Sequence, residues 1–246
     1  MLLNFSVVGG VTSSVTTSGG IVYNPSQGTI TDRNSNIITI SNGTITDTLG
    51  THPVTFSSAT NQVIYQYTAP NNATAQVTVN YSTYKIMTNF GVSGIDEYNS
   101  GNPISRSLIS SIVLPDGSQY SFTYEPTYQG LQNAVTGRLA SVTLPTGGVI
   151  NYSYSTSPGG TDNSMMKDGT PAAMRRTIGS GTWTYARSSR GGSLTSTTVI
   201  DPGGNEADLN FSGIYVTQRT TYNGSGISRS QLRDEFVCYN GNYSGC

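Results

Sequence analysis

Charged side chains are scarce in this sequence. They make up 10% of its 246 residues, well below the ~25% that is usual for soluble domains. The formal net charge is −1, so no excess of basic residues favours nucleic acid or an anionic membrane as a partner. The sequence also lacks the apolar run of about 18 residues that a membrane-spanning helix requires. We therefore expect no nucleic-acid partner and no membrane span.

Residues that carry catalytic or metal chemistry are almost as rare. His52 is the only histidine, and no serine lies in a nucleophile motif, so a Ser-His-Asp triad is not indicated. One histidine and two cysteines near the end do not have the spacing of a metal site. The stretch 201–208 combines three carboxylates with Asn205, which suits either a polar turn or weak calcium binding. We interpret it as a polar turn and predict a protein that is not an enzyme and has no cofactor or metal.

The two cysteines, Cys238 and Cys246, enclose Asn-Gly and Ser-Gly pairs. This spacing is compatible with a small loop closed by a disulfide, which would fit an oxidising compartment. Two free thiols, or a bridge to another chain, are alternatives, because two cysteines alone do not fix the connectivity. Low charge and many threonine, serine and asparagine residues are also typical of secreted proteins, so we predict an extracellular or cell-surface location.

Residues that favour turns and strands dominate the sequence instead. It contains 29 glycines and 16 tyrosines, and β-branched residues recur at a period of two, whereas no window shows the periodicity of a helix. Roughly 14 to 18 short runs of this kind, spaced by about 8–12 residues, are typical of an all-β protein. The predicted fold is therefore a set of stacked antiparallel β-hairpins with almost no helix.

One stretch occurs twice, at residues 110–124 and 140–154, with a shift of about 30 residues. The matching positions are Leu114 and Leu144, Pro115 and Pro145, Gly117 and Gly147, Phe122 and Tyr152, and Tyr124 and Tyr154. Proline and glycine supply a turn, and the aromatic residues after it alternate with hydroxyl residues, so one face of the hairpin is aromatic. A single hairpin cannot bury that face, which predicts that hairpins stack side by side.

The second copy and the residues before it resemble the YD repeat of RHS proteins. The residues that carry the resemblance are Tyr124-Glu125, Gly137-Arg138-Leu139, the strand that ends at Pro145, Gly147-Gly148, and Asn151-Tyr152-Ser153-Tyr154. The resemblance implies a curved or spiral sheet of hairpins over most of residues 28–246. It departs from the family in two ways: a longer interval before Gly137, which indicates an inserted loop, and the lack of a complete self-cleaving core and toxin domain. Toxin release is therefore not carried over.

Residues 1–27 carry no charge and are rich in glycine, serine and threonine, so we predict an N-terminal arm followed by a repeat domain at 28–246. A repeat segment leaves sheet edges exposed, and exposed edges pair with other chains. We therefore expect a homo-oligomer or filament: a structural subunit that assembles through sheet edges or strand donation into a surface fibre or shell. The alternatives are an adhesin or glycan-binding module, with Trp183 as a contact, and a fragment of a toxin-encapsulating RHS shell.

Overall fold

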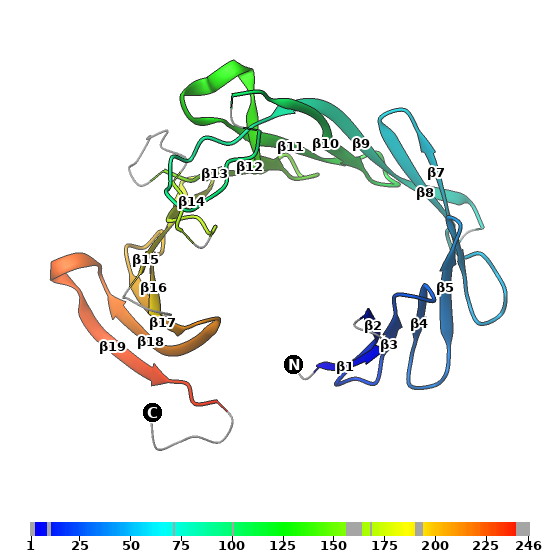
Figure 1. Ribbon diagram of the computed structural model, residues 1–246, viewed down its shortest axis with the longest axis horizontal. Helices are drawn as coiled ribbons and strands as arrows, with labels where there is room; N and C mark the ends of the chain where they lie inside the picture. The colour runs from blue at the N-terminus through cyan, green and yellow to red at the C-terminus, as the bar shows by residue number, and fades with distance from the viewer. Residues whose placement is uncertain are drawn as a thin grey trace. The chain divides into compact units, whose positions relative to one another are not determined.

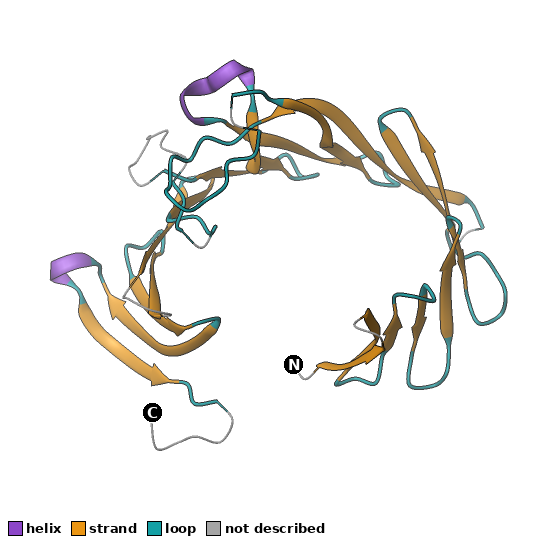
Figure 2. Cartoon of the chain, in the orientation of Figure 1, coloured by secondary structure: helices purple, strands orange, loops and turns teal. Residues whose placement is uncertain are grey.

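The computed structural model describes residues 3–8, 11–70, 72–99, 101–155, 164–167, 169–189 and 194–239. Strands dominate this part of the chain (Figures 1 and 2). They are β1 (Leu3–Val8), β2 (Val11–Thr17), β3 (Val22–Asn24), β4 (Thr29–Thr31), β5 (Ile37–Ser41), β6 (Thr44–Thr46), β7 (Val54–Ala59), β8 (Gln62–Thr68), β9 (Thr74–Ile86), β10 (Ile104–Val113), β11 (Gln119–Pro126), β12 (Val135–Thr143), β13 (Val149–Ser153), β14 (Ala173–Ile178), β15 (Gly181–Ser189), β16 (Leu194–Ile200), β17 (Glu206–Ser212), β18 (Tyr215–Asn223) and β19 (Ser230–Phe236).

The predicted all-β fold is confirmed. Strands that follow one another in the chain pair antiparallel, from β2–β3 to β18–β19, as expected for stacked hairpins. The helical segments among the described residues are two short 3-10 turns, η1 (Tyr128–Asn133) and η2 (Gly226–Ser228). Four residues inside η1 have non-helical backbone angles, namely Gln129, Gly130, Leu131 and Gln132. The curvature that the RHS resemblance implies stays a prediction.

Contacts between residues divide the chain into two units. Unit 1 contains Met1–Tyr81 and Ser111–Gln119, and unit 2 contains Ser82–Ser110 and Tyr120–Cys246. Strands β9, β10 and β11 therefore contribute residues to both units. Within unit 1, β3 pairs with β2 and with β4. The boundary predicted after residue 27 is not a boundary between these units, and the independence of an N-terminal arm stays a prediction.

The same three-residue loop joins strands in both units. The N–H of the residue before the loop donates to the C=O of the residue after it, and the N–H of the third loop residue donates back to the residue before the loop. The third residue has positive φ, as in a type I turn followed by a left-handed residue. These loops are 17–21, 32–36, 47–51 and 114–118 in unit 1, and 144–148 and 201–205 in unit 2, each range including its two flanking residues. The turns predicted at Pro115–Gly117 and Pro145–Gly147 are two of them.

Unit 2 has a small buried core beside β12. Its buried apolar residues are Ile86, Met87 and Ala134, and Ile86 pairs with Val135 in parallel orientation. The buried Thr127 donates its hydroxyl to the carbonyl oxygen of Met87 at 2.6 Å. The loop inserted before Gly137 therefore packs its two ends against the residues that follow β9, and this contact closes the core.

Candidate interaction surface

The residues of the repeat motif include a buried ion pair in unit 2. Arg138 of β12 donates from Nε to Oε2 of Glu125 at 2.7 Å and from Nη2 to Oε1 at 2.9 Å. Thr136 donates its hydroxyl to Oε2 of the same carboxylate at 2.7 Å. Glu125 is buried, with 7% of its surface exposed. A bidentate pair of this kind is strong and directional, so the Tyr-Glu and Gly-Arg-Leu elements of the motif act together as a clamp between β11 and β12.

Aromatic rings hold the guanidinium of Arg138 from two sides. Its Cζ lies 4.1 Å from the ring centroid of Tyr154 and 4.8 Å from that of Phe90. Burial raises the pKa of the Tyr154 hydroxyl, which the positive charge of Arg138 partly offsets. Cation–π contacts contribute about 0.5–2 kcal/mol each, depending on how far they are removed from water. Tyr154, the last aromatic position of the second copy, therefore helps to position the arginine.

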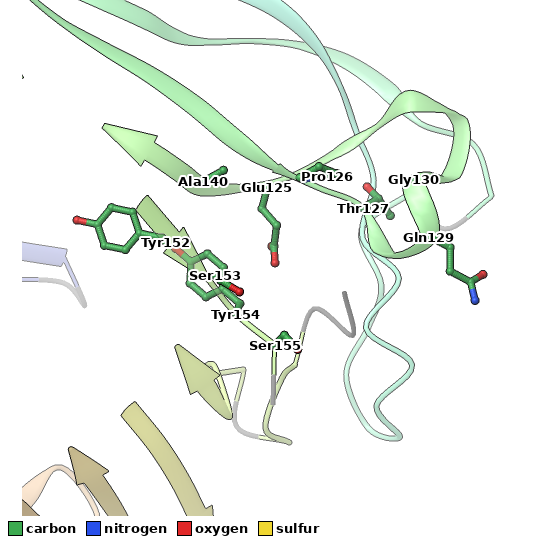
Figure 3. A pocket seen from close by; sticks show the side chains of 10 residues that line it. All are labelled: Glu125, Pro126, Thr127, Gln129, Gly130, Ala140, Tyr152, Ser153, Tyr154 and Ser155. Carbon is green, nitrogen blue, oxygen red and sulfur yellow. The ribbon is translucent and has the colours of Figure 1, made fainter. Parts of the chain in front are cut away.

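A pocket of about 290 Å³ lies beside this ion pair, lined by residues that include Glu125, Ala140, Tyr152, Tyr154 and Ser155. In Figure 3 the side chain of Glu125 extends from its strand toward the side of the pocket where Tyr154 and Ser155 lie. Its carboxylate is already bonded to Arg138 and Thr136. The pocket therefore offers no free acid for general acid–base catalysis, which needs a proton-transferring group within reach of a substrate.

The other motif residues have structural surroundings. Pro115 and Gly117 lie in a loop of unit 1 that closes between Leu114 and Ser118, and Pro145 and Gly147 lie in the equivalent loop of unit 2. Tyr124 packs edge-on against Tyr84, with ring centroids 5.1 Å apart, and lies opposite Leu139. Gly137 adopts a φ of 91° within β12, a value that suits glycine. Tyr152 lies opposite Arg176 of β14.

A second ion pair with a buried carboxylate was not predicted from the sequence. Arg229 binds the carboxylate of Glu206, which is 5% exposed, and its Nη1 lies 2.9 Å from Oδ2 of Asp208. The guanidinium lies over the ring of Tyr222, with Cζ 4.0 Å from the centroid. Glu206 and Asp208 were singled out only as part of a polar turn. No local sequence signal joins them to Arg229, because Glu206 and Arg229 are 23 positions apart and Arg229 lies between η2 and β19.

Aspartates that begin several loops bind their own loop. Oδ1 of Asp201 accepts a hydrogen bond from the backbone N–H of Asn205 at 2.8 Å, and Asp47 binds Thr51 in the same way. Hydrogen bonds from Asn205 lower the pKa of Asp201, and hydrogen bonds from Thr51, first from its hydroxyl and then from its N–H, lower the pKa of Asp47, because they stabilise the charged form. Residues 201–205 thus form a polar turn, and Glu206 and Asp208 belong to β17. No group of three His, Cys, Asp or Glu side chains arranged to hold a metal occurs within the described residues.

The remaining candidate residues make contacts of their own. Trp183 of β15 faces Arg176, whose Cζ is 4.4 Å from the ring centroid. The hydroxyl of Thr46 lies 3.3 Å from Nδ1 of His52. Cys238 follows β19, whereas Cys246 lies outside the described residues, so the Cys238–Cys246 disulfide stays a prediction. No helix in the described ranges is long and apolar enough to cross a membrane.

Unit 1 presents one apolar face across its strands. Residues that lie directly opposite each other in paired strands share a face of the sheet. The apolar residues that follow from this pairing, which we call the apolar face, are Val15, Tyr23, Ile30, Ile38, Ile40, Ile45, Val54, Phe56, Val63, Tyr65, Tyr67, Ala75, Val77 and Val79. The opposite face carries mainly threonine, serine and glutamine, together with Val22, Ile37 and Ile64.

The apolar face is open to solvent. Ile38 is 42% exposed, Ile40 is 46% exposed and Tyr65 is 39% exposed. None of the unit 1 residues whose burial is described is buried. Large exposed apolar patches mark interaction surfaces or aggregation sites in soluble proteins. This face is therefore the strongest candidate for an interaction surface in unit 1.

Comparison with known protein families finds no family that matches the chain, and no curated protein matches it either. The resemblance to RHS proteins therefore rests on the motif residues alone and stays a prediction.

Proposed function

We propose that the chain is a non-catalytic structural subunit that self-associates through the apolar face of unit 1. The observation that carries the proposal is the absence of buried side chains among the unit 1 residues whose burial is described. A large apolar side chain contributes about 1.5–3 kcal/mol when it is removed from water. A sheet with one apolar face needs a second layer to obtain this stabilisation.

A second copy of the chain suits this role because the face needs no complementary charge. The strands of unit 1 contain no charged residue, and its charges lie in turns, for example at Asp32, Arg33, Asp47 and Asp116. Charged residues, above all lysine, normally protect sheets from pairing with other chains. Two apolar sheet faces can pack together about 10 Å apart, as in a β-sandwich.

The assembled form that we propose is an extracellular or cell-surface fibre or shell. Pairing of strand edges and donation of a strand from residues 1–27 would extend such an assembly. A contact that does not close on itself produces a filament, and one that closes produces a ring. Face-to-face packing stabilises the subunits, and edge contacts would set how they repeat.

A segment of a longer RHS-like shell is the second candidate. The bonds between Glu125 and Arg138 favour it, because they give the two halves of the repeat motif a shared structural role. In this case, further repeats of a longer chain would cover the apolar face of unit 1. The purified 246-residue chain would then remain monomeric.

Sedimentation velocity with two lysine variants tests the proposal. Tyr65 and Gln66 are neighbours on β8, both exposed, and they lie on opposite faces of the sheet. Tyr65→Lys places a charge on the apolar face and should weaken association by about 100-fold or more, as expected for a buried unpaired charge. Gln66→Lys should leave association unchanged. A wild-type chain that stays monomeric at high micromolar concentration, or equal behaviour of the two variants, would contradict self-association through this face.

A further inference from the structure

A hollow of about 560 Å³ lies on one face of the sheet in unit 2. Its floor includes Val199 and Ala207, which lie opposite each other on β16 and β17. Trp183 of β15 lines one side, and Arg219 and Thr221 of β18 line the other. Because neighbouring strands are about 4.8 Å apart, the two sides are separated by about 14 Å. The small side chain of Ala207 makes room between them.

Trp183, the aromatic residue that lines the hollow, is held in place by an arginine on the neighbouring strand. Trp183 and Arg176 lie opposite each other on β15 and β14, and the guanidinium stacks 4.4 Å from the ring centroid. The indole is neither buried nor fully exposed, and it lines the hollow. A fixed aromatic ring of this kind provides a flat apolar surface at little cost in side-chain entropy.

The opposite side carries polar groups without partners. Arg219, Thr221 and Asn223 are alternate residues of β18, so they share a face at intervals of about 7 Å. Within the described residues, none of these three side chains makes a hydrogen bond or an ion pair. By contrast, Asp201 and Asn205 at the rim are bonded to each other. A row of free donors and acceptors across from an aromatic ring and above an apolar floor is the composition of a binding site for a small polar ligand.

We propose that this hollow binds a saccharide. Trp183 packs against the C–H face of a sugar ring, and Arg219, Thr221 and Asn223 bond its hydroxyl groups. Arg219 lies opposite Glu235, whose carboxylate pairs with Arg233. The carboxylates of Asp201 and Glu206, which also line the hollow, bond Asn205 and Arg229. The guanidinium of Arg219 therefore favours a sugar that carries a carboxylate, because charge-assisted hydrogen bonds are stronger than neutral ones. The residues of this hollow all belong to unit 2. The site is therefore separate from the apolar face and does not depend on self-association.

An array of neutral and uronate-containing oligosaccharides, probed with the full chain, tests the site. The best ligand is then titrated by calorimetry against the wild type and four variants. Trp183→Ala should weaken binding by about 10-fold or more, as for a central tryptophan anchor. Arg219→Ala should remove the preference for uronates. Ala207→Gln fills the floor without removing either side, and it should also weaken binding by about 10-fold or more.

Arg233→Ala is the matched control, because Arg233 is an exposed arginine of β19 that pairs with Glu235 and does not line the hollow. It should keep wild-type affinity. Circular dichroism checks that each variant retains its strands. The proposal is overturned if no saccharide on the array binds, or if Trp183→Ala and Ala207→Gln both bind within twofold of the wild type.

Discussion

Replacing Arg138 by methionine should destabilise unit 2 strongly. Methionine keeps the aliphatic stem but removes the guanidinium that bonds both oxygens of Glu125. Removing one partner of a buried pair costs about 3–5 kcal/mol, because the other charge stays buried without compensation. Loss of the contacts with Phe90 and Tyr154 acts in the same direction. This is a large part of the ~5–15 kcal/mol that normally stabilises a domain.

Urea denaturation followed by the fluorescence of Trp183 measures this change, because Trp183 is the single tryptophan and lies in unit 2. With a denaturant slope of about 2 kcal/mol per molar urea, the midpoint should fall by about 2 M. The double variant Glu125→Gln, Arg138→Met also removes the charge of Glu125 that the single change leaves unpaired. It should recover at least half of the lost free energy of unfolding. Arg233→Met is the control: it breaks an exposed ion pair with Glu235, in which the Arg233 side chain is 71% exposed. It should lower the free energy of unfolding by no more than ~1 kcal/mol. A loss below 1 kcal/mol for Arg138→Met would refute the proposed clamp.

Two further predictions concern the repeated loops. Gly147→Ala should lower the free energy of unfolding by about 1–2 kcal/mol in the same urea assay, because the φ of 84° at this position disfavours a side chain. Gly148→Ala is the control: Gly148 does not have a positive φ, so this change should be nearly neutral. Asp201 has a pKa below its unfolded value because Asn205 donates hydrogen bonds to it, so its contribution to stability is present above about pH 4 and is lost as the pH falls through the folded pKa. Asp201→Asn should therefore lower the urea midpoint at pH 6, and the difference from the wild type should shrink as the pH falls below about 4. A difference that stays constant with falling pH would contradict this reasoning.

Local sequence signals predicted the strands and turns well. Period-two alternation indicated the all-β fold, and the Pro-x-Gly pairs located the loops at 114–118 and 144–148. Asn42 and Gly43 both have positive φ, as expected for the Asn-Gly hairpin turn. These features depend on neighbouring residues only, so the sequence is sufficient to predict them.

Interactions across strands could not be predicted in the same way. The apolar face depends on the register that aligns Ile40, Ile45 and Val54 on three different strands. The ion pair between Glu206 and Arg229 joins residues on separate hairpins, and no periodicity marks it. Local alternation specifies which residues of a strand share a face, but register depends on the loops and on packing between strands.

Negative-stain electron microscopy of the purified chain in native buffer tests self-association most directly, with the Tyr65→Lys variant beside it. We expect filaments, rings or other ordered assemblies for the wild type and small separate particles for the variant. Small, uniform particles the size of a single chain for the wild type, with its strands retained, would contradict the account and favour a segment of a longer shell.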